Sequence, residues 1–314
     1  MKNDLYAPRP SPWNNIFKFL GILMLLFLIV GIFAPAPEGD CIAHIKIAGE
    51  ITYDETGSIL GGGVANTPEE ISSLLDDAES DAKVKVILLE VNSPGGSAVA
   101  SKEIFDRVRE LGKPNMVYMT EVAASGGYYV SAASDYIIAN PNTLTGSIGA
   151  RGSFMNYEDL FSKLGLREEV IKSGALKDIG SGSRNLTEKE KIILQGLIDE
   201  TFATFKKDVE AGRDGKINFG VYNEYLDARI LTASQAKRAG LIDEIGGMKR
   251  VIEKANQMAG INVTDGSAPL PLCDFEPKGG LNLFTDLGSS FGKSIADGLM
   301  KGISEKQEVQ LNYK

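Results

Sequence analysis

The chain has 314 residues, of which 43% are hydrophobic and 24% are charged, and its net charge is −9. This composition fits a globular protein of one or two domains. The acidic balance argues against nucleic acid as a partner, because such binding depends on basic surface. Two cysteines, Cys41 and Cys273, are too few for a disulfide scaffold or a zinc site. They fit a single bridge outside the cytoplasm as well as two free thiols.

The N-terminal region predicts a membrane anchor. Residues 19–34 carry no charge, and the run from Ile16 contains only Lys18. At about 1.5 Å per residue such a helix spans roughly 24–29 Å, enough to cross a bilayer. Basic residues precede the run and acidic residues follow it (Lys2, Arg9 and Lys18; Glu38 and Asp40). The positive-inside rule then predicts a cytoplasmic segment at 1–15, a retained anchor at 16–36 and an extracytoplasmic remainder.

The first half of the remaining chain alternates between predicted strands and helices. Residues 41–51 and 84–91 read as strands, the second as an apolar run typical of a buried parallel strand. A helix is expected after Thr67, with Pro68 at its first position and Glu70 completing a capping box. An amphipathic helix follows the glycine-containing loop at 92–97.

The second half continues this alternation. We expect strands at 115–119, 135–140 and 167–174, and helices from 125 and at 156–165. A long helix is expected from Thr187 to about Arg213, again with a capping glutamate. A strand and a short helix ending at Gly240 precede a last helix from Met248. Strands that alternate with helices predict an α/β fold with a parallel sheet.

Residues 41–260 are predicted to form the main domain, with a C-terminal extension at 261–314. Apolar residues of this extension recur every three or four positions, which is typical of an amphipathic helix: Phe284, Leu287, Phe291, Ile295, Leu299 and Ile303. Such a helix could pack on its own domain, on a membrane or on a partner.

Ser125 is the candidate nucleophile, because alanines and glycines on both sides leave its hydroxyl accessible. A serine needs a base to take its proton. The single histidine, His44, lies in a predicted apolar strand and is more readily a satisfied core residue. Lysine is the other common base, and Lys172 and Lys177 lie beside small residues. Spacing alone does not choose between them.

Two glycine-containing loops supply candidate oxyanion donors. The N–H of Gly126 directly follows the serine, near the start of a helix. The sequence NSPGG at 92–96 lies where a buried strand meets a helix. Both loops are expected at the carboxyl edge of the sheet, where sites of such folds lie.

The motifs VNSPGG, ASGGYY, TGSIG and KSGALKDIGS, in this order, resemble the signal peptide peptidase A family in its short, single-copy form. The resemblance covers about residues 45–258. It implies the Clp/crotonase fold, a repeated β-β-α superhelix with a parallel sheet, and a Ser/Lys dyad. We expect no cofactor or metal, because the sequence shows no metal or nucleotide motif. By match to the motifs, Ser125 is the nucleophile, Lys177 the general base and Ser147 the residue that orients the lysine. Gly126 and Gly96 would form the oxyanion hole, and Gly95 and Gly127 would contact substrate.

The resemblance also implies an assembly and a substrate class. A single-copy chain would complete each dyad across a subunit boundary, in a homo-oligomeric ring that we expect to be an octamer. The implied function is a membrane-anchored endopeptidase that degrades remnant signal peptides or other apolar peptides. A second candidate is a stomatin-operon-type protease that cuts a membrane partner, although a serine-to-lysine spacing of 177 − 125 = 52 argues against it. A crotonase-type acyl-CoA enzyme is less favoured, because coenzyme A is cytosolic and the anchor would export this domain. A non-catalytic scaffold is less favoured, because the serine, the lysine and both glycine loops are intact.

Overall fold

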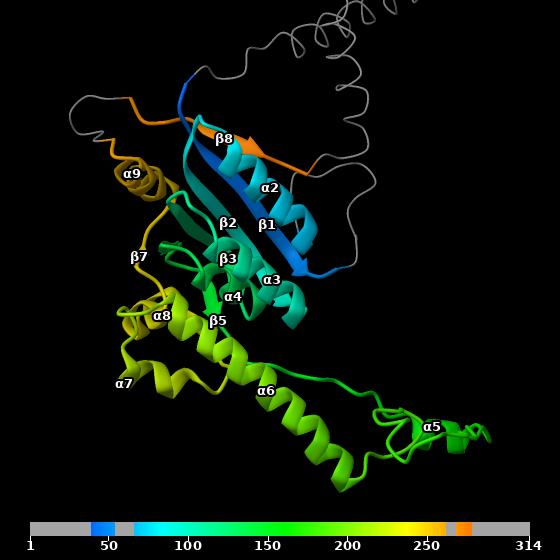
Figure 1. Ribbon diagram of the computed structural model, residues 1–314. Coiled ribbons are helices and arrows are strands. Elements are labelled where there is room, and N and C mark those ends of the chain that lie inside the picture. Colours follow the sequence, from blue (N-terminus) through cyan, green and yellow to red (C-terminus); the bar gives the residue numbers. More distant parts are fainter. Residues whose placement is uncertain (1–38, 54–65, 262–267, 278–314) are drawn as a thin grey trace, which may run out of the picture. The chain divides into compact units, whose positions relative to one another are not determined.

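A computed structural model describes residues 39–53, 66–261 and 268–277 (Figure 1). The described residues from Asp40 onward belong to one compact unit. The predicted anchor at 16–36 and the predicted apolar helix after residue 278 lie outside the described residues. Within the described part of the chain, no helix is long and apolar enough to cross a membrane.

Three long parallel strands form the centre of the sheet. They are β1 (Cys41–Ile51), β2 (Val84–Gly96) and β3 (Asn115–Ala124), which lie in the order β3-β2-β1. Ile45 of β1 is in register with Leu89 of β2, which is in register with Val117 of β3, and all three side chains are fully buried. Apolar residues buried on both faces explain this parallel arrangement. The three predicted strands are confirmed, but β2 and β3 each run five residues further than expected.

The far side of β3 pairs with two short strands in succession. β4 (Tyr136–Ala139) pairs with the first half of β3, and β5 (Leu144–Gly146) pairs with its last three residues. β7 (Glu244–Ile245) extends the sheet beside β4. β6 (Ile230–Thr232) lies antiparallel to β5. The expectation of a wholly parallel sheet is therefore wrong at this edge, where an outer strand can run in either direction.

Helices cover both faces of the sheet. α2 (Pro68–Ser80), α3 (Ala98–Arg109), α4 (Gly126–Ala132) and α8 (Ala233–Ala239) contribute to one large apolar core. α9 (Met248–Met258) packs on the opposite face through Val251 and Ala255. The expected capping box of Thr67 and Glu70 is present at the start of α2.

α6 (Glu188–Gly212) begins after the predicted capping box of Thr187 and Glu190, and Arg213 is its C-cap, which agrees with the expected end at about Arg213. Its C-terminal part packs on α4 through Phe205. Arg213 is fully buried and forms an ion pair with Asp243 at 2.8 Å. α7 (Phe219–Tyr222) and a 3₁₀ turn (Asn223–Tyr225) follow.

The region before α6 contains α5 (Glu158–Lys163) and mostly irregular, exposed backbone. The strand predicted at 167–174 is wrong, because these residues form no ladder with any described strand. Val170 and Ile171 supply the β-branched pattern but are exposed. These two apolar side chains are therefore not part of the hydrophobic core of this chain.

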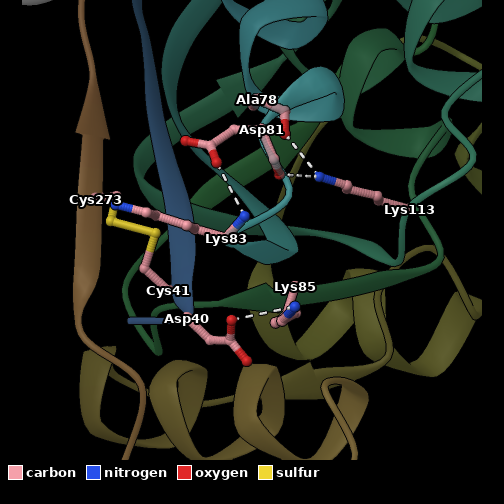
Figure 2. The surroundings of a disulfide bond; sticks show 8 residues. All are labelled: Asp40, Cys41, Ala78, Asp81, Lys83, Lys85, Lys113 and Cys273. Atoms are coloured by element: carbon pink, nitrogen blue, oxygen red, sulfur yellow. Dashed lines mark hydrogen bonds and ion pairs between the residues drawn. A yellow bond between two sulfur atoms is a disulfide. The ribbon is translucent and has the colours of Figure 1, made fainter. Parts of the chain in front are cut away.

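A strand absent from our expectations closes the other edge of the sheet. β8 (Leu272–Phe275) lies parallel to β1, within the segment expected to be a C-terminal extension. A disulfide joins Cys41 of β1 to Cys273 of β8 (Figure 2). His44 of β1 contacts Asp274 of β8 at 2.8 Å through Nδ1 and Glu90 of β2 at 2.9 Å through Nε2. β8 is thus held by backbone pairing, a covalent bond and a charged cluster.

Candidate active site

Ser125 lies at the junction of β3 and α4 with a positive φ, at φ 52° and ψ −121°. Its N–H donates to the Gly146 carbonyl at 2.8 Å, and its carbonyl accepts from the Tyr129 N–H at 2.8 Å. Its hydroxyl makes no hydrogen bond to any described residue and does not cap α4. A non-glycine residue held at positive φ is uncommon and is typical of functional sites. The strand-to-helix turn therefore presents a half-buried, unengaged hydroxyl.

The loop at 92–96 lies directly against this turn. Gly95, with φ 98°, approaches so closely that a Cβ placed on it would lie 2.5 Å from the Gly126 nitrogen and 2.8 Å from the Ser125 Cβ. A Cβ on Gly126 would lie 3.2 Å from the Gly96 nitrogen. A Cβ on Gly127 would lie 2.5 Å from the Ser93 carbonyl oxygen. The structure thus brings together the two glycine loops that were expected at one sheet edge.

The Ser93 side chain fixes this loop by hydrogen bonds, a role that the sequence did not reveal. Its buried hydroxyl donates to the Gly49 carbonyl at 2.6 Å and accepts from the Gly95 N–H at 3.1 Å. One side chain thereby links β1 to the turn that faces Ser125. Its place in NSPGG is the only sequence signal that could have indicated this role.

Two tyrosines fix α4 behind the serine. The Tyr128 hydroxyl donates to the Leu241 carbonyl at 2.9 Å, and burial raises its pKa. The Tyr129 hydroxyl hydrogen-bonds Asp208 of α6, and its ring stacks on Phe205 at 4.3 Å. Burial, followed by the Asp208 contact, raises the pKa of Tyr129. Both hydroxyls stay protonated near neutral pH and serve as structural donors.

Ser147 lies close to the Ser125 turn because β5 pairs with the end of β3, where Gly146 is in register with Ala124. Ser147 also has a positive φ, of 53°, and its N–H donates to the Arg229 carbonyl at 3.0 Å. The two predicted site serines are therefore joined through the hydrogen bond from Ser125 to Gly146.

Lys177 lies in a turn closed by its own N–H, which donates to the Gly174 carbonyl at 3.1 Å, and its side chain is exposed. No hydrogen bond or ion pair joins it to Ser125 or Ser147 within the described residues. Lys172, the other candidate, forms an ion pair with Asp178 at 2.6 Å. Both ring nitrogens of His44 contact carboxylates, those of Glu90 and Asp274, which agrees with its expected role as a satisfied core residue.

The site therefore offers an unengaged hydroxyl and backbone N–H groups at the start of α4, where the first amides lack intrahelical acceptors. This combination suits nucleophilic attack on a carbonyl with stabilisation of the resulting oxyanion. Within the described ranges, no group of three or more His, Cys, Asp or Glu residues could hold a metal ion.

Comparison with known families matches this chain to two peptidase families. The model of peptidase family S49 matches residues 107–262, and the model of Clp protease matches residues 53–145. The latter match agrees with the α/β, mostly parallel sheet. A solved structure of 1510-N, a membrane-bound stomatin-specific protease, is 19% identical, covers 77% of this chain and all of its own, and superposes with a TM-score of 0.49.

Two relatives place the chain more closely. A putative protease of Methanocaldococcus jannaschii is 37% identical over 86% of this chain and 87% of its own length. A putative signal peptide peptidase SppA of Enterococcus faecium is 41% identical over 55% of this chain and 50% of its own length. Together with the Ser125 turn and the facing glycine loop, these likenesses identify the chain as a serine protease of peptidase family S49, the signal peptide peptidase A family.

Proposed function

We propose that this protease is a membrane-anchored endopeptidase that uses Ser125 as nucleophile and Lys177 as general base to cleave remnant signal peptides. The observation that carries the proposal is the Ser125 turn, whose strained backbone aims an unengaged hydroxyl beside the glycine loop at 92–96. Ser147, next to this turn, orients the lysine amine. Gly95 and Gly127 are the proposed backbone contacts of the substrate, although in the single chain both are buried, against Gly126 and Ser93.

The reaction follows the usual course of acyl transfer. The Ser125 hydroxyl attacks the peptide carbonyl while the neutral Lys177 amine takes its proton. The negative oxygen of the tetrahedral intermediate accepts hydrogen bonds from the N–H groups of Gly126 and Gly96. The Lys177 ammonium then protonates the leaving amine, and water releases the acyl group by the same steps in reverse order.

A second copy of the chain would complete this site. Lys177 is exposed and unconnected to Ser125. Residues 154–176 before it, and Ile192 of α6, expose large apolar side chains, among them Met155, Leu160, Leu164, Val170 and Ile171. Exposed apolar clusters are typical of protein interfaces. Burying this segment against a neighbour would desolvate the amine and favour its neutral form. Repeating one such contact closes a ring, for which we propose eight copies.

The disulfide supports a location outside the cytoplasm. Structural disulfides persist in oxidising compartments and are rare in the cytosol. The Cys41–Cys273 bond therefore agrees with the topology inferred from the charges around residues 16–36. The protease domain would then face signal peptides left in the membrane after export.

The substrate would bind as an added strand beside the site, because extended peptides pair readily with open sheet edges. Alanines before Ser125 and glycines after it leave room for the backbone of a substrate to approach. We expect the bound stretch to be apolar with small side chains. A stomatin-type substrate is the second candidate, and the spacing of 52 residues between serine and lysine argues against it.

A serine-directed fluorophosphonate probe tests the proposed roles on the full chain in detergent. We expect labelling of wild type and of Lys172→Ala, no labelling of Ser125→Ala, and slow labelling of Lys177→Ala at neutral pH. Peptide cleavage should fall by at least about 10³-fold in the Ser125 and Lys177 variants. Wild-type cleavage by either variant would refute the assignment.

A further inference from the structure

Arg184 lies between two carboxylates and contacts each of them twice. Its Nε and Nη2 donate to Asp178 at 3.1 and 2.9 Å. Its Nη1 and Nη2 donate to Glu190 at 2.9 and 2.6 Å. A planar guanidinium that forks onto two carboxylates fixes their relative orientation, which a lysine point charge does not.

The Glu190 end of this bridge is firmly anchored. Glu190 is 2% exposed and lies in the first turn of α6, where its carboxylate accepts from the Thr187 N–H at 2.8 Å. The hydrogen bonds from Arg184, followed by that from Thr187, lower the pKa of Glu190 to about 2. The carboxylate is therefore charged at neutral pH and fixed to a regular helix.

The Asp178 end lies in the segment that carries the proposed base, since Asp178 directly follows Lys177. Its side chain is only 11% exposed and also accepts from Lys172 at 2.6 Å. The hydrogen bonds from Arg184, and then from Lys172, lower the pKa of Asp178. Two cations thus engage the carboxylate nearest to Lys177 in the chain.

We infer that Arg184 is a positioning residue, which ties the Lys177 turn to the first turn of α6 and engages the neighbouring Asp178 carboxylate. This inference rests on the proposed function, in which Lys177 is the general base. In the surrounding backbone, which is mostly irregular, this bridge supplies the rigid link that a base needs in order to meet its nucleophile reproducibly.

Removing the guanidinium has two expected effects. The turn loses its anchor, so the amine reaches Ser125 less often. Asp178 also loses one of its two cationic partners and keeps only Lys172. A less compensated carboxylate favours the charged form of an amine that the assembled site brings near it. The charged groups that face this cluster are Lys172, Asp178 and Arg184 on the segment, Glu158 of α5 through Asn185, and Glu190 and Lys191 of α6.

The test compares Arg184→Gln with wild type as the full chain in detergent, using an alanine- and leucine-rich fluorogenic peptide and the fluorophosphonate probe. We expect kcat to fall by about 10- to 100-fold while KM changes by less than about threefold. The acidic limb of the pH profile should move to higher pH, both for peptide cleavage and for labelling by the probe. Arg184→Lys should restore only part of kcat, because it keeps the charge but loses the fork.

Arg250→Gln is the control, because Arg250 is about as exposed as Arg184 (34% against 30%) and also bridges two carboxylates, those of Glu244 and Glu253. A wild-type kcat and pH profile in folded Arg184→Gln would overturn the inference. A loss of activity in Arg184→Gln without a shift of the pH profile would also overturn it. An equal loss of activity in Arg250→Gln would do the same. If Arg184→Gln does not fold, Asp178→Asn takes its place: the inference stands if kcat falls and fails if kcat is unchanged. Lys177→Ala distinguishes failure of this inference from failure of the proposed function, because full activity of Lys177→Ala refutes the proposed function itself.

Discussion

The backbones of Gly95 and Gly126 are in direct contact, so that a Cβ on Gly95 would lie 2.5 Å from the Gly126 nitrogen. This contact joins the end of β2 to the start of α4 and defines the space beside the Ser125 hydroxyl. Neither loop alone forms the site, because the proposed oxyanion donors come from both.

Gly95→Ala should therefore abolish most activity. The new methyl group cannot occupy its position without displacing Gly126, and φ 98° is unfavourable for alanine. We expect kcat to fall by about 10²- to 10³-fold, as for the loss of an oxyanion donor. Gly196→Ala is the control, since a Cβ there meets open space on α6. Equal activity of the two variants would show that the contact is not needed for catalysis.

His44 provides a test of histidine-independent catalysis. Its ring contacts Glu90 and Asp274 on neighbouring strands, so its replacement affects the edge of the sheet and not the proposed reaction. His44→Gln should keep kcat/KM within about threefold of wild type at a temperature where it stays folded, while its unfolding midpoint falls. A loss comparable to that of Ser125→Ala would indicate a histidine base.

Much of the framework was predictable from local patterns. The capping boxes at Thr67 and Thr187 and the buried runs of β1 and β2 are determined by neighbouring residues, and the structure confirms them. The strand expected at 167–174 failed because its β-branched residues, Val170 and Ile171, are exposed in the single chain. In the sequence, an exposed β-branched run looks the same as one that is buried in a core.

The parts that could not be predicted depend on distant partners. β8 has only four residues, and its place beside β1 becomes evident only through the Cys41–Cys273 bond. Neither motif nor spacing indicated that Arg184 would bridge Asp178 and Glu190. The Ser125 turn was predictable because its glycines mark a place where two backbone segments approach closely. The residue that Lys177 meets is not determined by the sequence around Lys177.

The disulfide should contribute strongly to stability, because it links residues separated by 232 positions. The double variant Cys41→Ser, Cys273→Ser should lower the free energy of unfolding by about 2–5 kcal/mol. Denaturant titration of the full chain in detergent, with and without reductant, measures this. Reductant should destabilise wild type and leave the double variant unchanged. A reductant-insensitive wild type would show that the bond is not formed.

The Arg184 cluster predicts a defined pH dependence. Arg184 holds the pKa of Glu190 at about 2, below its ordinary value of 4.5. The resulting stabilisation is complete above pH 4.5 and is lost as the pH falls toward 2. Amide exchange in the first turn of α6 should therefore be faster in Glu190→Gln than in wild type at pH 7, and the difference should shrink in acid. The exposed neighbour Glu188→Gln should show little effect; an equal effect would contradict the account.

Mixing two inactive variants tests the shared Ser125–Lys177 site most directly. Neither Ser125→Ala nor Lys177→Ala should cleave peptide alone. Co-assembled in equal amounts, they should recover about one quarter of wild-type activity, because a site at the boundary of two copies takes its serine from one and its lysine from the other. Complete inactivity of verified mixed oligomers would contradict the account.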